Sequence, residues 1–250
     1  MSDLLRMDCF CLRRKRSVMV CLILAFVFAL VETPLAALFR WLLHVDERIP
    51  PTPVSEILKN PYSSISRMLL FLGVSGFYFA DQEAGFLKTI AGQFPRRSYI
   101  AVSKFFVTAL PVAVFALAGI LGDLIGRSVF YGVVFDAEIP AALGKLLLKL
   151  LLAHAVCTIL LMIVSALRLK ALGITLSVLF GLGFSGMIYD LISLVFYQLF
   201  KKHFELGDYM PDQILAADDP KTVLALVSAG VTIALFLYLS VWLYNRRDVR

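Results

Sequence analysis

The sequence predicts an all-α polytopic membrane protein with six transmembrane helices and both termini in the cytoplasm. Hydrophobic residues make up 60% of the 250 residues and charged residues only 17%, whereas a soluble domain carries about 25% charged residues. Several apolar runs exceed the roughly 18 residues that cross a membrane. These runs are continuous, as in 18–31, and lack the alternation of polar and apolar residues that is typical of a transmembrane β-barrel.

The first sixteen residues precede the first apolar run and end in a basic cluster at 13–16 (RRKR). Apolar residues mix there with Asp3 and Asp8 in an amphipathic pattern, which is typical of a segment lying on the cytoplasmic membrane surface. A frayed basic tail is the alternative. The sequence leaves both readings of residues 1–16 open.

Six apolar segments are expected to cross the membrane, which makes 1–250 a single transmembrane domain. A secretory signal peptide is the alternative for the first of them, but its apolar stretch continues beyond a typical signal core. Lys145 and Lys149 open the fourth segment and are expected to extend toward the membrane interface. The expected spans are 17–43, 65–80, 100–124, 145–167, 172–200 and 222–244.

The distribution of basic residues predicts the orientation of these spans. With both termini inside, the short inner segments hold fourteen of the 24 Lys and Arg residues, although the outer segments are longer. This is the positive-inside pattern of membrane proteins. It makes the link at 81–99 cytoplasmic, and it explains the net charge of +6 without a nucleic-acid partner.

Three acids fall within the apolar segments, Glu32, Asp123 and Asp190, and the first and last of them are the main candidate functional residues. Glu32 lies in the outer half of the first segment and Asp190 in the fifth. An ionisable group at membrane depth is costly, so it is a functional candidate by default. An acid that faces a neighbouring helix or the interface is the structural alternative. An ion-coupled secondary transporter would use such acids, but we find no internal repeat of the kind common in that class.

The fifth segment contains Gly181-Leu-Gly-Phe-Ser-Gly186, which matches G-x-G-x-x-G. A dinucleotide site requires a strand before this motif, and here the motif lies inside an apolar segment, so we reject that reading. Ser177, Gly181 and Ser185 recur every four residues instead. Small residues at this spacing predict close packing between membrane helices.

Catalytic motifs are absent from the sequence. It contains no G-x-x-x-x-G-K-[ST] phosphate loop, no G-x-S-x-G, no H-E-x-x-H and no kinase motif. The three histidines are scattered among different segments. We therefore expect no catalytic, cofactor-binding or metal-binding residue, and no enzyme activity of the chain by itself.

The link between the second and third apolar segments is polar and long enough to hold a helix. A helix over 83–90 places three apolar residues on one face, since residues three and four apart are neighbours. This pattern predicts a docking helix for a soluble partner. The residues expected to couple to that partner are Asp81, Glu83, Gly85, Phe86, Leu87, Lys88 and Ile90.

This link resembles the corresponding link in the permease subunits of type-2 ABC exporters. In that family the first part of the link has an aromatic residue, an acid, a glycine, a basic residue and an aliphatic residue at set spacings. A basic residue, an aromatic residue and a lysine then open the next span. The end of the chain, from Tyr244 to Val249, is also similar to the closing pattern of that family. The residues that match within the link are Phe79, Asp81, Gly85, Lys88, Ile90, Arg96, Arg97, Tyr99 and Lys104.

The resemblance implies the six-helix transmembrane fold of these exporters and a role in ATP-driven transport. It implies a separately encoded ABC ATPase that binds ATP and Mg, with 81–93 as the coupling helix and residues 1–16 as a surface helix. A second permease copy, identical or a close paralogue, completes the dimer in the bacterial cytoplasmic membrane. The expected substrate is an amphipathic, cytotoxic or antimicrobial peptide, moved for export or self-immunity; drugs, ions and lipids are alternatives.

Overall fold

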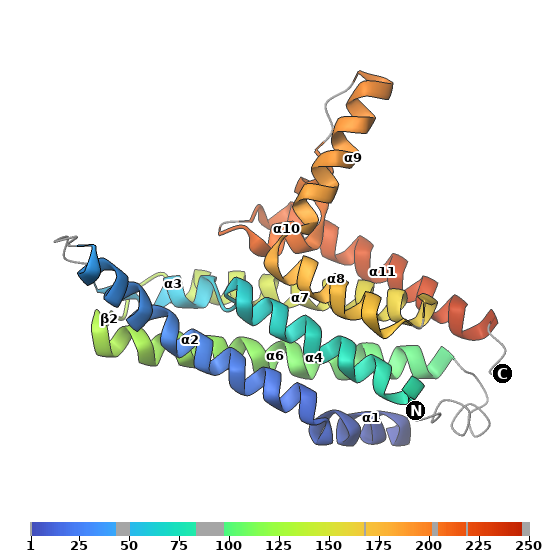
Figure 1. Ribbon diagram of the computed structural model, residues 1–250, viewed down its shortest axis with the longest axis horizontal. Helices are drawn as coiled ribbons and strands as arrows, with labels where there is room; N and C mark the ends of the chain where they lie inside the picture. Colours follow the sequence, from blue (N-terminus) through green and yellow to red (C-terminus); the bar gives the residue numbers. More distant parts are fainter. Residues whose placement is uncertain are drawn as a thin grey trace.

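The computed structural model describes residues 2–43, 51–83, 98–167, 169–201, 205–218 and 220–246. Its long helices lie side by side along the long axis of the molecule (Figure 1). In chain order the elements are α1 (Ser2–Arg14), α2 (Arg16–Leu42), β1 (Thr52–Pro53), α3 (Val54–Lys59), α4 (Ser64–Glu83), α6 (Ser98–Phe130), β2 (Val133–Val134), α7 (Ile139–Leu167), α8 (Lys170–Leu182), α9 (Ser185–Phe200), the 3-10 helix η1 (Leu206–Tyr209), α10 (Pro211–Ala216) and α11 (Thr222–Arg246).

Within the described residues, four helices are long and apolar enough to cross a membrane, and α8 with α9 make a fifth candidate when taken together. These helices confirm an all-α polytopic membrane protein. Helix α4 stands at the expected segment 65–80 but is not among the four. The four spans are Arg16–Arg40, Ser98–Phe130, Ile139–Leu167 and Thr222–Arg246.

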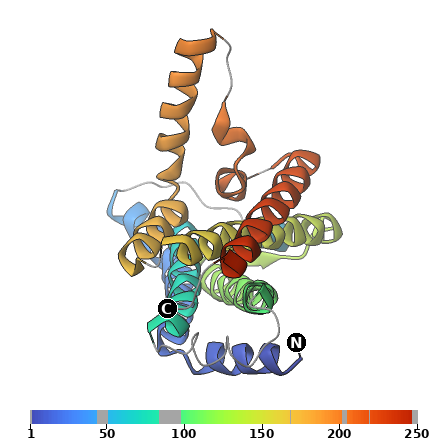
Figure 2. The ribbon, with the colours of Figure 1, turned by 90° about the vertical axis from the view of Figure 1, so that its right-hand side faces the viewer.

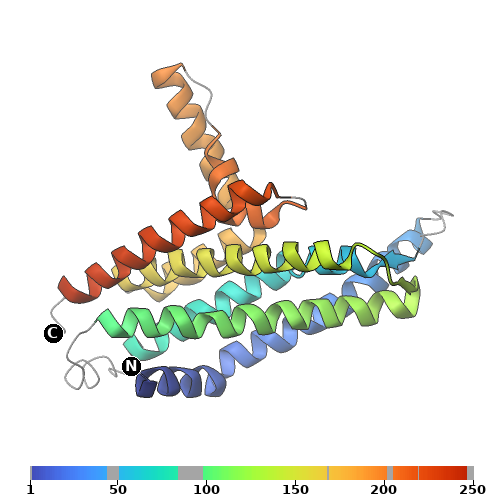
Figure 3. The ribbon, with the colours of Figure 1, turned by 180° about the vertical axis from the view of Figure 1, so that it is seen from behind.

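Helix α4 lies at the centre of the bundle. It contacts α2, α6, α7 and α8, and Phe71, Phe77 and Tyr78 on it are at most 2% exposed. On the far side α7 packs against α11 and α6, and these three helices lie side by side in Figure 3. The core therefore forms between α4 and α7, and surrounding helices separate α4 from the environment of the protein.

The expected span 172–200 is not one straight helix. It divides into α8 and α9, which are bent by 86° relative to each other. Gly183 caps α8 in the left-handed region at φ +81°, a conformation that glycine adopts without steric cost. Helix α9 therefore projects away from the bundle (Figure 2). The glycine-rich sequence that we read as a packing stripe also contains this break.

A two-stranded parallel sheet joins two connections at one end of the bundle. Thr52 pairs with Val133 and Pro53 with Val134. This sheet ties the start of α3 to the link between α6 and α7. The start of α1 and the end of α11 lie at the opposite end of the bundle, together with the end of α4 and the start of α6 (Figure 1).

The N-terminal amphipathic segment forms helix α1, which packs against the start of α6. Leu4 is 1% exposed and belongs to a small apolar cluster with Ile100. Asp8, on the same face, is 2% exposed and accepts a hydrogen bond of 2.5 Å from the Ser103 hydroxyl. One face of α1 is therefore covered by protein, which differs from the frayed tail that the sequence left open.

Candidate functional site

A polar cavity of about 480 Å³ lies at the end of the bundle opposite the start of α1 and the end of α11. Its walls come from the second half of α2, the start of α4 and the second half of α6, with α3, α7 and the end of α10. Eight charged side chains line it, four acidic and four basic, so its formal charge is balanced. They are Glu32, Arg40, Glu56, Arg67, Asp123, Arg127, Lys149 and Asp218.

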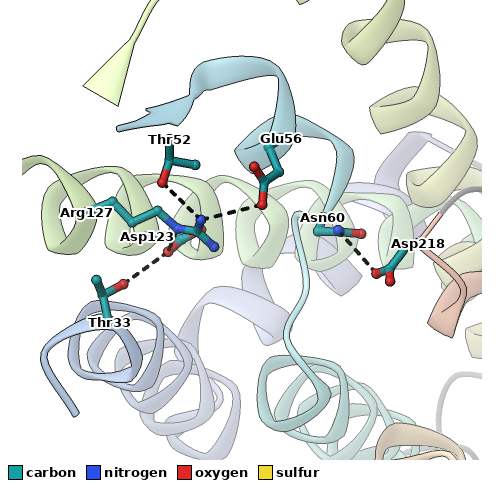
Figure 4. A network of polar contacts seen from close by, with 7 residues as sticks. All are labelled: Thr33, Thr52, Glu56, Asn60, Asp123, Arg127 and Asp218. Atoms are coloured by element: carbon teal, nitrogen blue, oxygen red, sulfur yellow. Dashed lines mark hydrogen bonds and ion pairs between the residues drawn. The ribbon is translucent and has the colours of Figure 1, made fainter. Parts of the chain in front are cut away.

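Arg127 on α6 is the centre of one polar network in this cavity (Figure 4). Its Nε donates to Asp123 Oδ1 at 2.8 Å, one helical turn away, and its Nη1 lies 3.7 Å from Glu56 Oε1. Nη1 also donates to Thr52 Oγ1 at 3.3 Å. Thr33 on α2 donates to Asp123 at 3.4 Å. The Arg127 charge is thus matched by two acids, and the network joins α2, β1 and α3 to α6.

Lys149 on α7 forms a second network in the wall of the same cavity. The side chain is buried (3% exposed), and its Nζ donates to Asn60 Oδ1 at 2.5 Å and to the Ala217 carbonyl at 2.9 Å. Asn60 in turn donates to Asp218 at 3.4 Å (Figure 4). A lysine that the sequence places at a helix start therefore joins α7 to the segments before α4 and after α10.

Arg67 on α4 is buried in the cavity wall, with 7% of its surface exposed. Its Nη2 donates to Ser64 Oγ at 3.1 Å. Its Nε and Nη1 have no hydrogen-bond partner, and no ion pair joins it to an acid among the described residues. Ser63 accepts a hydrogen bond from the Ser66 amide at 3.3 Å at the start of the helix, so hydroxyl groups surround the first turn.

The two acids that the sequence singled out are not brought together. Glu32 on α2 lines the cavity near Asp123 and Arg127. Asp190 lies on the exposed side of the projecting helix α9 and does not line the cavity. A shared ion-binding site of Glu32 and Asp190 therefore has no counterpart in the described part of the chain.

The three small residues of the fifth segment belong to two different contacts. Ser177 donates to the Phe71 carbonyl of α4 at 3.1 Å, and Gly181 lies against the backbone of Met68 on the same helix. Ser185 lies beyond the bend, where its hydroxyl donates to the Asp212 carboxylate on α10. Close packing on α4 thus involves Ser177 and Gly181, while Ser185 holds the base of α9.

Asp212 connects α9 to α10 and lies outside the spans. The carboxylate is 1% exposed and also accepts hydrogen bonds from Tyr189 at 3.1 Å and from Gln213 at 3.4 Å. Burial raises the pKa of Asp212 above its ordinary value of 3.8, although hydrogen bonds, that from Ser185 first among them, oppose the shift. The folded protein therefore binds this proton more tightly than the unfolded chain does.

We expect the Asp212→Asn variant to lose a part of the pH dependence of stability. Because the folded-state pKa is raised, protonation of Asp212 stabilises the fold as the pH falls toward that pKa, and the stabilisation is lost as the pH rises through it. The melting temperature of wild type should therefore rise relative to that of the variant as the pH is lowered from neutrality toward 3.8, the ordinary pKa of an aspartate. The exposed acid in Asp208→Asn is the control, and a pH profile of Asp212→Asn parallel to that of wild type would contradict the assignment.

Two of the seven predicted coupling residues lie within the described structure, at the other end of the bundle. Asp81 and Glu83 belong to the last turn of α4, and nothing is described of their side chains. The remaining five lie outside the described residues. Their assignment to an ATPase contact stays a prediction. They are Gly85, Phe86, Leu87, Lys88 and Ile90.

Sequence reasoning missed most of the polar cavity. Arg67, Arg127 and Lys149 were not among the candidate site residues, although each is a charge within or beside an apolar segment. That signal marks costly groups in membrane proteins. It does not by itself bring together residues from α4, α6 and α7.

Comparison with known families identifies the chain. The model of the family described as ABC-2 family transporter protein matches residues 4–185, almost three quarters of the sequence. A search of the curated proteins finds no significant match. The family match covers α1 to the start of α9, and thus most of the walls of the polar cavity. The chain therefore belongs to the ABC-2 transporter family and is an ABC-type permease, a multi-pass membrane subunit that is not catalytic on its own.

Proposed function

We propose that this permease forms half of an ATP-driven exporter in a bacterial cytoplasmic membrane. It has six spans and cytoplasmic termini, pairs with a second permease chain and works with a separately encoded ATPase that binds ATP and Mg. The family match carries this proposal. The fold supports it, since the start of α1, the end of α11 and the ends of α4 and α6 that flank the link 84–97 lie at one end of the bundle (Figure 1).

The proposed substrate is an amphipathic peptide of the cytotoxic or antimicrobial kind, moved for export or self-immunity. Export of drugs, ions or lipids is the alternative within the same class. A secondary transporter based on Glu32 and Asp190 is less well supported, since only Glu32 lines the polar cavity. Transport would couple to ATP hydrolysis through the link at 81–93.

The experiment that tests this proposal replaces two residues of the coupling link. The variant Glu83→Gln with Phe86→Ala removes one charge and one apolar anchor from the predicted docking helix. We expect at least about tenfold less ATPase to co-purify with the permease, which corresponds to about 1.4 kcal/mol of lost binding free energy. Substrate-dependent ATP hydrolysis should fall in parallel.

A matched control removes the same kinds of group from the opposite side. Glu205→Gln with Phe135→Ala changes an acid and a phenylalanine that are both exposed and lie in predicted outer loops. This control should retain the ATPase. If the coupling variant retains the ATPase as wild type does and exports normally, the docking assignment is wrong.

A further inference from the structure

The buried guanidinium of Arg67 has hydrogen-bonding capacity that the described protein does not use. An arginine side chain offers five N–H donors, yet Nε and Nη1 have no partner and only Nη2 is bonded, to Ser64. A buried polar group without a partner is costly, so such a group calls for an explanation. These two atoms each expose less than 1 Å², and other parts of the side chain contribute to the wall of the 480 Å³ cavity, which has room for a bound group.

Among the described residues of this wall, the other two basic side chains that are buried or partly buried already have polar partners. Arg127 is matched by Asp123 and Glu56, and Lys149 donates to Asn60 and to a backbone carbonyl. The neighbouring acid Asp212 accepts its hydrogen bonds from groups on α9 and α10, and none of them comes from Arg67. Arg67 is therefore the buried cation of this cavity that is suited to a further ligand.

The first turn of α4 adds favourable surroundings for a negative charge. Ser63, Ser64 and Ser66 line the cavity together with Arg67. The start of a helix carries a partial positive charge, and hydroxyl groups there can donate hydrogen bonds to an anion. A guanidinium beside a helix start matches the planar oxygens of a carboxylate or the oxygens of a phosphate.

We propose that this cavity binds a singly charged oxyanion, the carboxylate or phosphodiester group of a ligand, with Arg67 as its main cation. Glu32, on the α2 side of the same cavity, can take a cationic group of the same ligand. The inference names a chemical feature of the transported substrate, and in that respect it rests on the proposed function. A peptide with a free C-terminus and a phospholipid headgroup both carry the required group.

The test measures binding without any ATPase, so that its failure is distinguishable from failure of the proposed function. The purified full chain in detergent is titrated with two pairs of probes: an N-acetylated apolar tripeptide with a free or an amidated C-terminus, and dihexanoyl phosphatidylglycerol or the uncharged dihexanoylglycerol. We expect at least one anionic probe to raise the melting temperature more than its uncharged twin. The pair that responds identifies the source of the oxyanion.

Arg67→Gln should raise the half-saturating concentration of that probe at least about tenfold, as expected for a lost charge-assisted hydrogen bond. Arg246→Gln, which removes a cation stacked on Trp242 at the other end of the bundle, should leave it unchanged. If Arg67→Gln does not fold, Ser64→Ala is judged by the same criterion, since it removes the partner that holds the guanidinium. The proposal is overturned if no anionic probe exceeds its uncharged twin, or if the Arg67 or Ser64 variant binds as wild type does.

Discussion

The Gly181→Val variant is expected to lose about 3 kcal/mol or more of unfolding free energy, because it forces α8 away from α4. A Cβ atom at this position would lie 2.2 Å from Met68 Cα and 2.6 Å from Met68 N. These are backbone atoms, so no side-chain rotation can relieve the overlap. Separation of the two helices would also break the hydrogen bonds of Ser177 to Ser75 and to the Phe71 carbonyl.

A second glycine provides the matched control for this substitution. Gly230 lies within α11, and nothing lies within 4 Å of a Cβ atom added to it. Gly230→Val should therefore be neutral or slightly stabilising, since valine has a higher helix propensity than glycine. Thermal unfolding of both variants in detergent checks the difference. Equal melting temperatures would show that α4 and α8 are not in the close contact described.

The Asp8→Ala variant is expected to lose about 1–3 kcal/mol and to release α1 from the start of α6. The substitution leaves the buried Ser103 hydroxyl without its acceptor. The neighbouring Lys104 is 1% exposed, with its ammonium group 4.5 Å from the centre of the Phe77 ring. Removal of an acid from surroundings that contain a buried cation is more costly than removal of an acid at the surface.

Limited proteolysis measures the release of α1 directly. Trypsin should cleave at the end of α1, after Arg13 and Arg14, faster in Asp8→Ala than in wild type, and the melting temperature should fall. Asp3→Ala changes an exposed acid on the same helix and should behave as wild type. The same loss in both variants would mean that the buried contact of Asp8 contributes nothing specific.

The sequence predicts the long apolar helices well, since hydropathy and length alone determine them. The expected segments 17–43, 100–124, 145–167 and 222–244 lie on α2, α6, α7 and α11. A continuous apolar run does not show whether the helix that it forms is straight or bent. This is why the bend at Gly183 was not predicted. The bend depends on one left-handed residue and on the contact of Ser185 with Asp212, 27 residues further along the chain.

The polar cavity was largely unpredictable for a related reason. Many of the contacts in the cavity join residues that are far apart in the sequence. Lys149 bonds to Asn60, and Thr33 bonds to Asp123. Some contacts are local: Arg127 and Asp123 lie one helical turn apart on α6, and Arg67 and Ser64 lie three residues apart on α4. Opposite charges four positions apart in an apolar segment are visible in the sequence, and this spacing was the available signal for the site.

The bend between α8 and α9 has a consequence for the lipid around the protein. Helix α8 has 13 residues, so it rises about 20 Å, whereas the hydrocarbon layer is about 30 Å thick. With the long helices along the bilayer normal, α9 turns across the membrane before its far side is reached, carrying exposed apolar side chains such as Leu191 and Leu199. We therefore expect a hydrophobic mismatch on this flank of the permease and a local thinning of the bilayer there.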